Sequence, residues 1–240
     1  MKVTVDSPSP TSPGIPPKPW GLPAILLVLT VPTVLWGSAF FADAPEDLTS
    51  GEVIASIVSV VLIKDVLFIG VAAAFAVWRY RLGWAGLGFR PFDRELWWLP
   101  LATVSVMIVA MIAYGIALIG LGVEQPDQGF DPFFDTTALL PLTGLAFVII
   151  APISEETFFR GFVFAGLIRP FGLPLAMAAS GLLFGALHVN NLNTLALIVP
   201  IGFIGVLLAW LYYRTGSIWP SIFTHMLFNA FGFVGGVAGS

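Results

Sequence analysis

The chain has 240 residues, of which 58% are hydrophobic and only 10% are charged, and its mean hydropathy is +0.95. A soluble domain carries about 25% charged residues, and so few charges cannot cover a water-facing surface, whereas lipid tolerates apolar outer faces. Ten basic and 14 acidic residues give a formal charge of -4 without a basic patch, which excludes nucleic acid as a partner, and the lack of cysteine excludes disulfides and thiolate metal sites.

The N-terminal segment is rich in Pro and Ser and has no apolar periodicity, so residues 1–20 are predicted to form a disordered cytoplasmic tail. A cleaved signal peptide is the alternative, because Ala42-Asp43-Ala44 fits a small-x-small cleavage pattern. Against it, the apolar run from Trp20 to Ala42 is long enough to span a bilayer, and no compact basic region precedes it.

Apolar runs of about 20 residues, bounded by charge, Pro or Gly, predict an all-α polytopic transmembrane bundle of about seven spans. The predicted spans are residues 22–42, 53–78, 97–121, 138–167, 172–188, 194–213 and 217–236. The first three lie in an N-terminal region of transmembrane helices, residues 21–137, and the last four in a helical core, residues 138–237.

The connections between these spans alternate in charge. Those after the first and third spans contain acidic residues but no Lys or Arg, whereas those after the second, fourth and sixth contain arginines, among them Arg79, Arg169 and Arg214. The positive-inside rule therefore predicts a cytoplasmic N-terminus and an outer C-terminus. We expect an integral protein of a bacterial cytoplasmic membrane, with the lipid bilayer as its surroundings.

Lys64 and Asp65 fall inside the second predicted span, where a charged side chain costs about 2.5–3.5 kcal/mol on insertion scales and needs a partner or a function. Adjacent helical residues diverge by about 100°, so these two are not expected to neutralise each other on one face. Pairing with neighbouring helices, which would orient the second span, is the favoured interpretation. Contact with a substrate or an ion is the alternative.

Glu156 and Arg160 are four residues apart in the fourth predicted span, in the acid-first order that favours a pair on one helix face. Glu155 is then left without that partner, and an unpaired carboxylate in an apolar site is a candidate general base. The alternative is a pair of carboxylates at the cytoplasmic boundary that reaches water beside Arg160.

His188 and His225, the two histidines of the chain, lie at the end of the fifth predicted span and within the seventh. His225 and Asn229 are four residues apart and share a helix face, and both can donate hydrogen bonds to an oxyanion that develops on a cleaved carbonyl. The alternatives are a polar clamp between helices for His225 and Asn229, and a loop-bound interfacial histidine for His188.

The depth of these groups in the membrane decides whether they can meet. At 1.5 Å of rise per residue, measured from the cytoplasmic turns, Glu155 lies about 20 Å up, His188 about 28 Å and His225 about 15 Å. Helix tilts of about 20° can absorb this spread of about 13 Å, so the spacing permits a joint site without requiring one.

Three short motifs resemble those of one family and occur in the family's order. The segment Glu155-Glu156-Thr157-Phe158-Phe159-Arg160-Gly161 is similar to its EExxxR motif, Phe184 to His188 to its FxxxH motif, and His225 to Asn229 to its HxxxN motif. This is the family of CPBP intramembrane peptidases, which includes the type II CAAX prenyl endopeptidases and bacteriocin-immunity relatives. The resemblance covers about residues 141–232, with Leu87-Gly88-Phe89-Arg90 as a weak echo outside it.

The resemblance implies a CPBP-type catalytic core over residues 138–237 that hydrolyses a peptide bond of a membrane-associated protein or peptide. It also implies roles for six residues: water activation by Glu155 and His188, oxyanion stabilisation by His225 and Asn229, and support of the site by Glu156 and Arg160. It does not imply that the substrate is prenylated, since only one branch of the family takes such substrates.

Metal dependence and two other classes of function stay open. Glu155, His188 and His225 can in principle bind zinc and leave a position for water, but the sequence has no HExxH motif, and a metal-free glutamate base explains the same residues. A non-catalytic bacteriocin-immunity or scaffold protein would use the polar cluster only to bind a peptide. A small-solute transporter would use it as a pathway, although the sequence lacks the internal repeat that many transporters contain.

Overall fold

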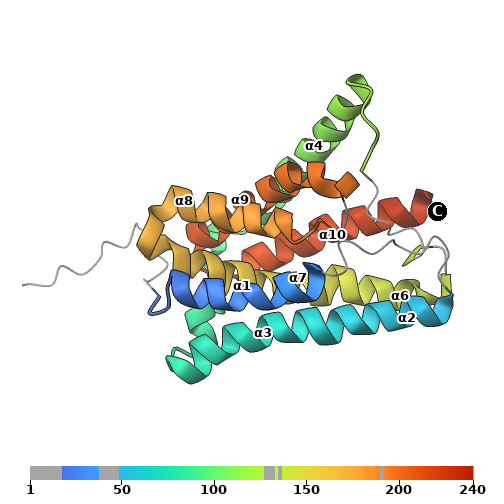
Figure 1. Cartoon of the computed structure of the whole chain (residues 1–240). Helices are drawn as coiled ribbons and strands as arrows, with labels where there is room; N and C mark the ends of the chain where they lie inside the picture. Colours follow the sequence, from blue (N-terminus) through green and yellow to red (C-terminus); the bar gives the residue numbers. More distant parts are fainter. Residues whose placement is uncertain (1–17, 38–48, 127–132, 135–136, 190–191, 240) are drawn as a thin grey trace, which may run out of the picture.

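The computed structural model describes residues 18–37, 49–126, 133–134, 137–189 and 192–239, and all regular elements within these ranges are helical (Figure 1). The predicted all-α fold is confirmed for this part of the chain. The predicted N-terminal tail lies outside the described residues except for Lys18, Pro19 and Trp20, and the alternative cleavage pattern at residues 42–44 lies wholly outside them.

The first half of the described chain forms one helix, one long rod and one tilted helix. The helix is α1 (Leu22–Gly37), and the tilted helix is α4 (Leu99–Gly120), which two short turns, η4 (Trp84–Leu87) and η5 (Arg94–Leu96), precede. The rod consists of α2 (Ser50–Ser59), η2 (Val60–Asp65), α3 (Val66–Ala73) and η3 (Ala74–Arg79), of which η2 and η3 are π-helical.

The second half contains a second rod that bends back on itself, followed by two helices. The rod consists of η6 (Thr137–Leu139), α6 (Leu140–Gly144), η7 (Leu145–Ile150), α7 (Ala151–Glu156), η8 (Thr157–Phe164) and α8 (Ala165–Ala186). The turn η9 (Leu192–Leu197) then leads to α9 (Ile198–Thr215) and α10 (Trp219–Gly239).

The bend in the second rod lies at Gly172, whose backbone angles (φ 73°, ψ 170°) are not helical. Pro170 and Pro174 flank it, and proline disrupts the hydrogen bonds of a helix interior. The second arm of α8 returns beside η8, where the Ser180 hydroxyl donates a hydrogen bond to the Phe159 carbonyl. The end of α8 is thereby carried back alongside α7.

Five helical segments of the described chain are long and apolar enough to cross a membrane, which confirms a transmembrane bundle. They are Ser50–Arg79, Arg94–Gly120, Thr137–Ala186, Thr194–Thr215 and Trp219–Ala238. The predicted count of seven is not confirmed, because the described part of α1 has only 16 residues and two predicted spans fall in the one segment that bends at Gly172. The orientation in the membrane stays a prediction.

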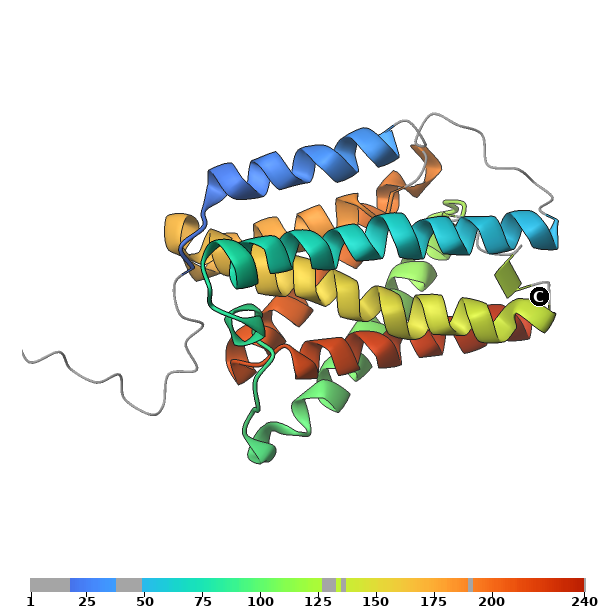
Figure 2. The ribbon, with the colours of Figure 1, turned by 90° about the horizontal axis from the view of Figure 1, so that it is seen from below.

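The two rods lie side by side in both views, with α1 along them and α4 diverging from the bundle (Figures 1 and 2). Aromatic side chains fill the core between the rods. Phe68 of α3 stacks on Phe158 of η8, with ring centroids 4.2 Å apart, and Phe159 meets Phe184 of α8 edge to face at 5.1 Å. This packing fixes η2 and α3 against α7 and η8, the region that carries the two glutamates.

The loop after the first rod is joined to the turn between α9 and α10. The Ile218 amide donates to the Gly88 carbonyl at 2.8 Å, and the Ser217 hydroxyl donates to the Arg90 carbonyl at 2.6 Å. Gly88 has a φ of +99°, and a Cβ there would lie 2.5 Å from the Tyr212 ring. The segment Leu87 to Arg90, which resembles the family only weakly, therefore has a structural role. It holds the N-terminal region against the helical core.

Helices α8 and α9 approach closely because glycines line their contact, as small residues often do between transmembrane helices. Gly181 and Gly185 of α8 face Gly202 and Gly205 of α9. A Cβ on Gly185 would lie 2.4 Å from the Ile198 carbonyl oxygen and 2.8 Å from the Gly202 nitrogen. Both are backbone atoms that cannot rotate away.

Gly185→Ala is therefore expected to lower the free energy of unfolding by about 2–3 kcal/mol, because the helices must separate to admit the methyl group. The matched control is Gly70→Ala, where a Cβ would meet nothing within 4 Å and a helix interior gains from alanine. Thermal melting in detergent, followed by circular dichroism, measures both. Equal melting of Gly185→Ala and the native protein would contradict the close contact.

Candidate active site

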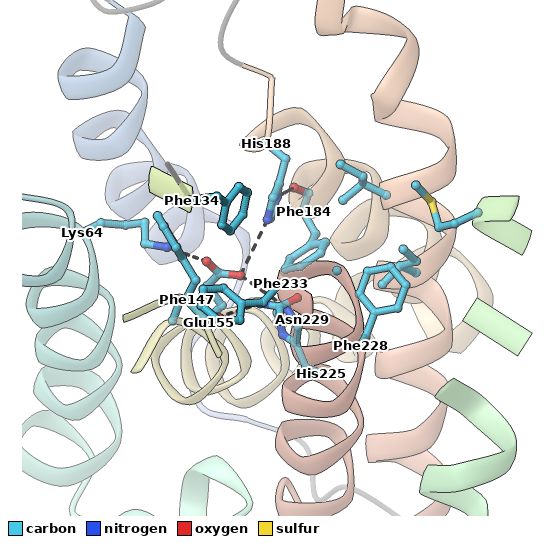
Figure 3. Close-up of a pocket in the computed structure, with 15 residues that line it drawn as sticks. Lys64, Phe134, Phe147, Glu155, Phe184, His188, His225, Phe228, Asn229 and Phe233 are labelled. Carbon is cyan, nitrogen blue, oxygen red and sulfur yellow. Dashed lines mark hydrogen bonds and ion pairs between the residues drawn. The ribbon is translucent and has the colours of Figure 1, made fainter. Parts of the chain in front are cut away.

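A cavity of about 410 Å³ lies between the two rods, α9 and α10, with one residue of α4 at its edge (Figure 3). Its polar lining consists of Lys64, Glu155, His188, His225 and Asn229. Its apolar lining is largely aromatic and includes Phe134, Phe147, Phe184, Phe228 and Phe233. The four predicted catalytic residues thus share one cavity, and the estimated spread in depth does not keep them apart.

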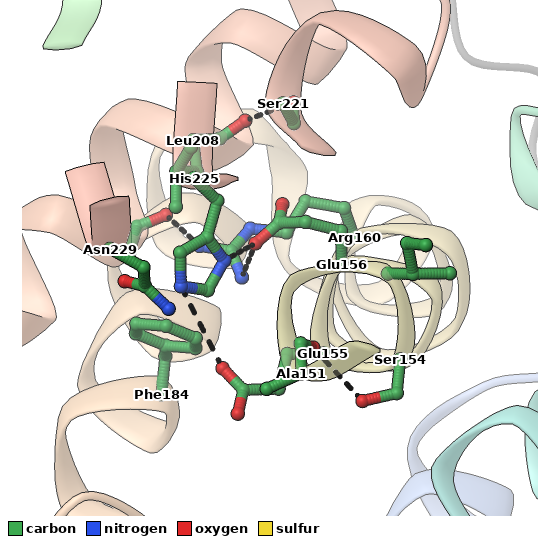
Figure 4. A network of polar contacts seen from close by, with 12 residues as sticks. Ala151, Ser154, Glu155, Glu156, Arg160, Phe184, Leu208, Ser221, His225 and Asn229 are labelled. Carbon is green, nitrogen blue, oxygen red and sulfur yellow. Dashed lines mark hydrogen bonds and ion pairs between the residues drawn. The ribbon is translucent and has the colours of Figure 1, made fainter. Parts of the chain in front are cut away.

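Helix α7 directs its two glutamates to different neighbours, since consecutive helical residues diverge by about 100°. Glu155 points into the cavity (Figure 3), whereas Glu156 points toward His225 and Arg160 (Figure 4). Both carboxylates are buried. The alternative of a snorkelling carboxylate pair at the membrane boundary is therefore wrong.

One carboxylate oxygen of Glu156 contacts both Arg160 and His225. Its Oε1 lies 2.9 Å from the Arg160 Nη1 and 2.9 Å from the His225 Nδ1. Arg160 also donates from Nη2 to the Gly205 carbonyl of α9 at 3.1 Å, and neither Glu156 nor Arg160 is exposed. The predicted pair of Glu156 and Arg160 is confirmed, and it links α7 to α10 through His225 and η8 to α9 through the Gly205 carbonyl.

Phe184 packs beneath the site and contacts three of its members. Its ring centroid lies 4.5 Å from that of His188 and 5.6 Å from that of His225, and the Arg160 guanidinium carbon lies 4.6 Å from the ring centroid. Phe184 is 1% exposed. One apolar ring therefore restrains the orientation of both imidazoles. This contact gives a physical reason for the phenylalanine in the FxxxH pattern.

Glu155 uses its two oxygens on different partners. Its Oε1 accepts a hydrogen bond from the Lys64 Nζ at 2.5 Å, and its Oε2 lies 3.7 Å from the His188 Nε2 and 3.9 Å from the His225 Nε2. The prediction that Glu155 lacks a partner is wrong, because η2 packs against α7 and brings Lys64 onto it. The sequence marked Lys64 as a costly intramembrane charge but did not indicate which helix it meets.

Lys64 and Asp65 also contact each other, with 3.4 Å between Nζ and Oδ1. The prediction that they do not neutralise each other is wrong, because the long lysine side chain spans the angle between adjacent residues. The Asp65 Oδ1 accepts a hydrogen bond of 2.5 Å from the Ser154 hydroxyl on α7. Both charges thus reach α7, and the favoured interpretation, pairing between helices, is confirmed.

The hydrogen bonds of the histidines fix which ring nitrogens carry hydrogen. The His188 Nδ1 lies 2.7 Å from the Phe184 carbonyl, which can only accept, so Nδ1 donates and Nε2 of the neutral ring is an acceptor. The His225 Nδ1 donates to Glu156 in the same way. The distances from each Nε2 to the Glu155 Oε2 are too long for direct hydrogen bonds but suit a bridging water.

Asn229 lies at the side of the cavity on α10 and donates from Nδ2 to the Phe147 carbonyl of η7 at 2.9 Å. Because a carboxamide nitrogen carries two hydrogens, this bond uses one and orients the group. The clamp between helices, given above as the alternative for Asn229, is thus present, and it leaves a second N–H for another acceptor in the cavity.

The three candidate zinc ligands lie somewhat farther apart than the ligand atoms of a formed tetrahedral zinc site. Among the described residues, no group of three or more His, Cys, Asp or Glu side chains has the spacing of a metal site. Tetrahedral zinc with bonds of about 2.0–2.1 Å would hold its ligand atoms about 3.4 Å apart, closer than the separations seen here. Lys64 also supplies a cation to the same carboxylate.

Comparisons with known proteins support the resemblance. Residues 137–231 match the family described as type II CAAX prenyl endopeptidase Rce1-like. A protein of Bacillus subtilis (strain 168) named "Putative membrane peptidase YdiL" is 31% identical over 134 residues, which cover 53% of this chain and 52% of that protein. The match thus spans about half the length of that relative, and no solved structure matches. The resemblance to this family of membrane peptidases is confirmed.

Proposed function

We propose that this chain, whose residues 137–231 match the prenyl endopeptidase family, is an intramembrane endopeptidase of the CPBP type. The observation that carries the proposal is the position of one Glu155 oxygen within 3.9 Å of both histidine Nε2 atoms, at the wall of the cavity. Three side chains converge there, from α7, from the turn after α8 and from α10, which a purely structural pairing would not need.

Glu155 and His188 activate the attacking water in this proposal. Both the Glu155 Oε2 and the His188 Nε2 accept hydrogen bonds, so one water can donate a hydrogen to each and turn its oxygen toward a substrate carbonyl. As the water oxygen bonds to the carbonyl carbon, Glu155 takes a water proton as general base. The proton later passes to the amine nitrogen when the carbon–nitrogen bond breaks.

Asn229 and His225 stabilise the oxyanion that forms on the carbonyl. Asn229 offers its second N–H, and its bond to Phe147 holds it in place without any change of charge. His225 donates from Nε2 only when its ring is doubly protonated, because its Nδ1 hydrogen is directed to Glu156. Glu156 and Arg160 hold His225 in position and do not touch the substrate.

The substrate is proposed to be a membrane-associated protein or peptide. The cavity lies among helices that span the bilayer and is lined mostly by apolar residues, five of them phenylalanines, which suits apolar side chains next to the cleaved bond. Water and a peptide bond must both enter this apolar site, and the five polar groups at its wall supply the hydrogen bonds that they lose.

No metal takes part in the proposed mechanism. We expect hydrolysis by the purified protein to continue in excess EDTA, since Lys64 already neutralises Glu155 and the ligand spacing is wide for zinc. The rate before and after dialysis against the chelator measures this. A loss that added zinc restores would contradict the metal-free mechanism.

The test of the function is a comparison of peptide ends in membranes from cells that make the native protein, Glu155→Gln or the control Glu124→Gln. Glu124 is an exposed acidic residue outside the cavity. New peptide ends that occur with the native protein and with Glu124→Gln, and vanish with Glu155→Gln, support a peptidase. The same ends in all three samples, or solute flux in proteoliposomes without any cleavage, would favour a scaffold or a transporter.

A further inference from the structure

We propose that Lys64 is a positioning residue for the proposed peptidase, acting through Glu155, with Asp65 and Ser154 as its anchor. The inference rests on the proposed function for its catalytic meaning. It assigns a role to the N-terminal region, because Lys64 belongs to η2, outside the matched residues 137–231. The known motifs of the chain do not include it.

The first argument is that the two oxygens of the Glu155 carboxylate have different partners. Lys64 holds Oε1 at 2.5 Å, and this leaves Oε2 as the oxygen that faces His188 and His225 (Figure 3). A carboxylate without this contact can rotate about its last bond, a broad torsion, and present either oxygen or neither. Lys64 thereby selects one orientation of the general base.

The second argument is charge. Glu155 is 5% exposed, and a carboxylate removed from water needs an opposite charge or several hydrogen-bond donors. Among the described residues, Lys64 is the one non-histidine cation in contact with it. A general base must be ionised before it accepts a proton, and Lys64 supplies a positive charge without becoming a donor to the oxygen that does the chemistry.

The third argument is the support of Lys64 itself. Asp65 lies 3.4 Å from Nζ, and the Ser154 hydroxyl, one residue before Glu155, holds the Asp65 carboxylate at 2.5 Å. The contacts therefore form a closed ring, from Ser154 of α7 to Asp65, from Asp65 to Lys64, and from Lys64 back to Glu155 of α7. The turn η2 carries both Lys64 and Asp65 and packs against α7.

The first experiment measures the contact without using activity. Lys64→Met is expected to lower the melting temperature in detergent because it leaves the buried Glu155 carboxylate without its lysine, and Glu155→Gln because, among the described residues, Lys64 then keeps only Asp65 as an anionic partner. The double variant is expected to lose less in melting temperature than the sum of the two single losses. Ile63→Met is the matched control, since Ile63 is 51% exposed on the same turn. Additive losses would overturn the pair, whether or not the chain is a peptidase.

The second experiment measures the role. Lys64→Met is expected to lower kcat by about 10²-fold with KM within about twofold of native, because a misplaced base slows the chemical step and not the binding of substrate. Lys64→Arg restores the charge and is expected to recover at least about tenfold of the loss. A raised KM with native kcat would make Lys64 a substrate contact and overturn the proposal, as would an Arg variant no faster than the Met variant.

The two experiments separate this inference from the function on which it rests. If the native protein cleaves nothing, the proposed function fails while the melting arm still reports on the pair. If the native protein cleaves and Lys64→Met cleaves at the native rate, the proposed function stands and the role of Lys64 is overturned.

Discussion

Glu155→Gln is expected to lower kcat by about 10²–10⁴-fold, the range that general-base catalysis contributes. Glutamine keeps the shape of the side chain and can still accept a hydrogen bond from Lys64 through its amide oxygen, so the site keeps its volume. It lacks a group that takes a proton from water. Single-turnover hydrolysis of a membrane peptide by purified protein in detergent measures the loss directly.

The control for this prediction is Glu124→Gln, which makes the same chemical change at an exposed position. It is expected to hydrolyse the peptide at the native rate. Circular dichroism on both variants establishes that they are folded. A folded Glu155→Gln protein with native kcat would remove Glu155 from the chemistry.

Arg160→Met is expected to cause the largest loss of stability, about 3–5 kcal/mol, because it leaves the Glu156 carboxylate buried without its cation. Neither side chain of the pair is exposed, and Arg160 additionally holds the Gly205 carbonyl of α9. Methionine fills most of the same volume, so the loss comes from charge and hydrogen bonding more than from a void. Chemical or thermal unfolding in detergent measures it.

Two companion variants identify the cause. Arg169→Met removes an exposed arginine and is expected to leave stability within about 0.5 kcal/mol of native. Adding Glu156→Gln to Arg160→Met removes the orphaned charge and is expected to recover part of the loss. If Glu156→Gln destabilises the Arg160→Met protein as much as it destabilises the native protein, the buried pair does not explain the effect.

The sequence predicted which residues line the cavity better than it predicted their contacts. The spacing of four between Glu156 and Arg160 predicted a pair on one helix face, and the structure has it at 2.9 Å. Local periodicity is enough for such a contact, because both residues belong to one helix. It also placed His225 and Asn229 on one face, and both line the cavity.

Contacts between different helices could not be predicted from the sequence. The partner of Glu155 is Lys64, 91 residues away, and nothing in the spacing of either residue specifies how η2 packs against α7. The same limit applies to His225, whose Nδ1 meets Glu156 while its Nε2 faces Glu155. Packing of aromatic rings between the rods and of glycines between α8 and α9 decides these meetings, and the spacing of such residues does not tell which element each face meets.

The number of spans was less predictable than their existence. Apolar runs identified the helices, but a Pro or Gly in a sequence does not tell whether a helix continues through it, kinks or ends; at Gly172 the backbone is not helical, and two helical arms meet there. The long helical segments Thr194–Thr215 and Trp219–Ala238 agree with the last two predicted spans to within a few residues.

The measurement that tests the central claim most directly uses water labelled with ¹⁸O. Membranes from cells that make only Glu155→Gln keep any uncleaved substrate, and purified native protein is added to them in the labelled water. Hydrolysis by a water that Glu155 activates predicts new peptide C-termini that carry ¹⁸O, seen by mass spectrometry and missing when Glu155→Gln or His188→Ala protein is added instead. New C-termini that carry no ¹⁸O with any of the three proteins, or that carry it equally with native, Glu155→Gln and His188→Ala protein, would contradict a peptidase built on Glu155 and the two histidines.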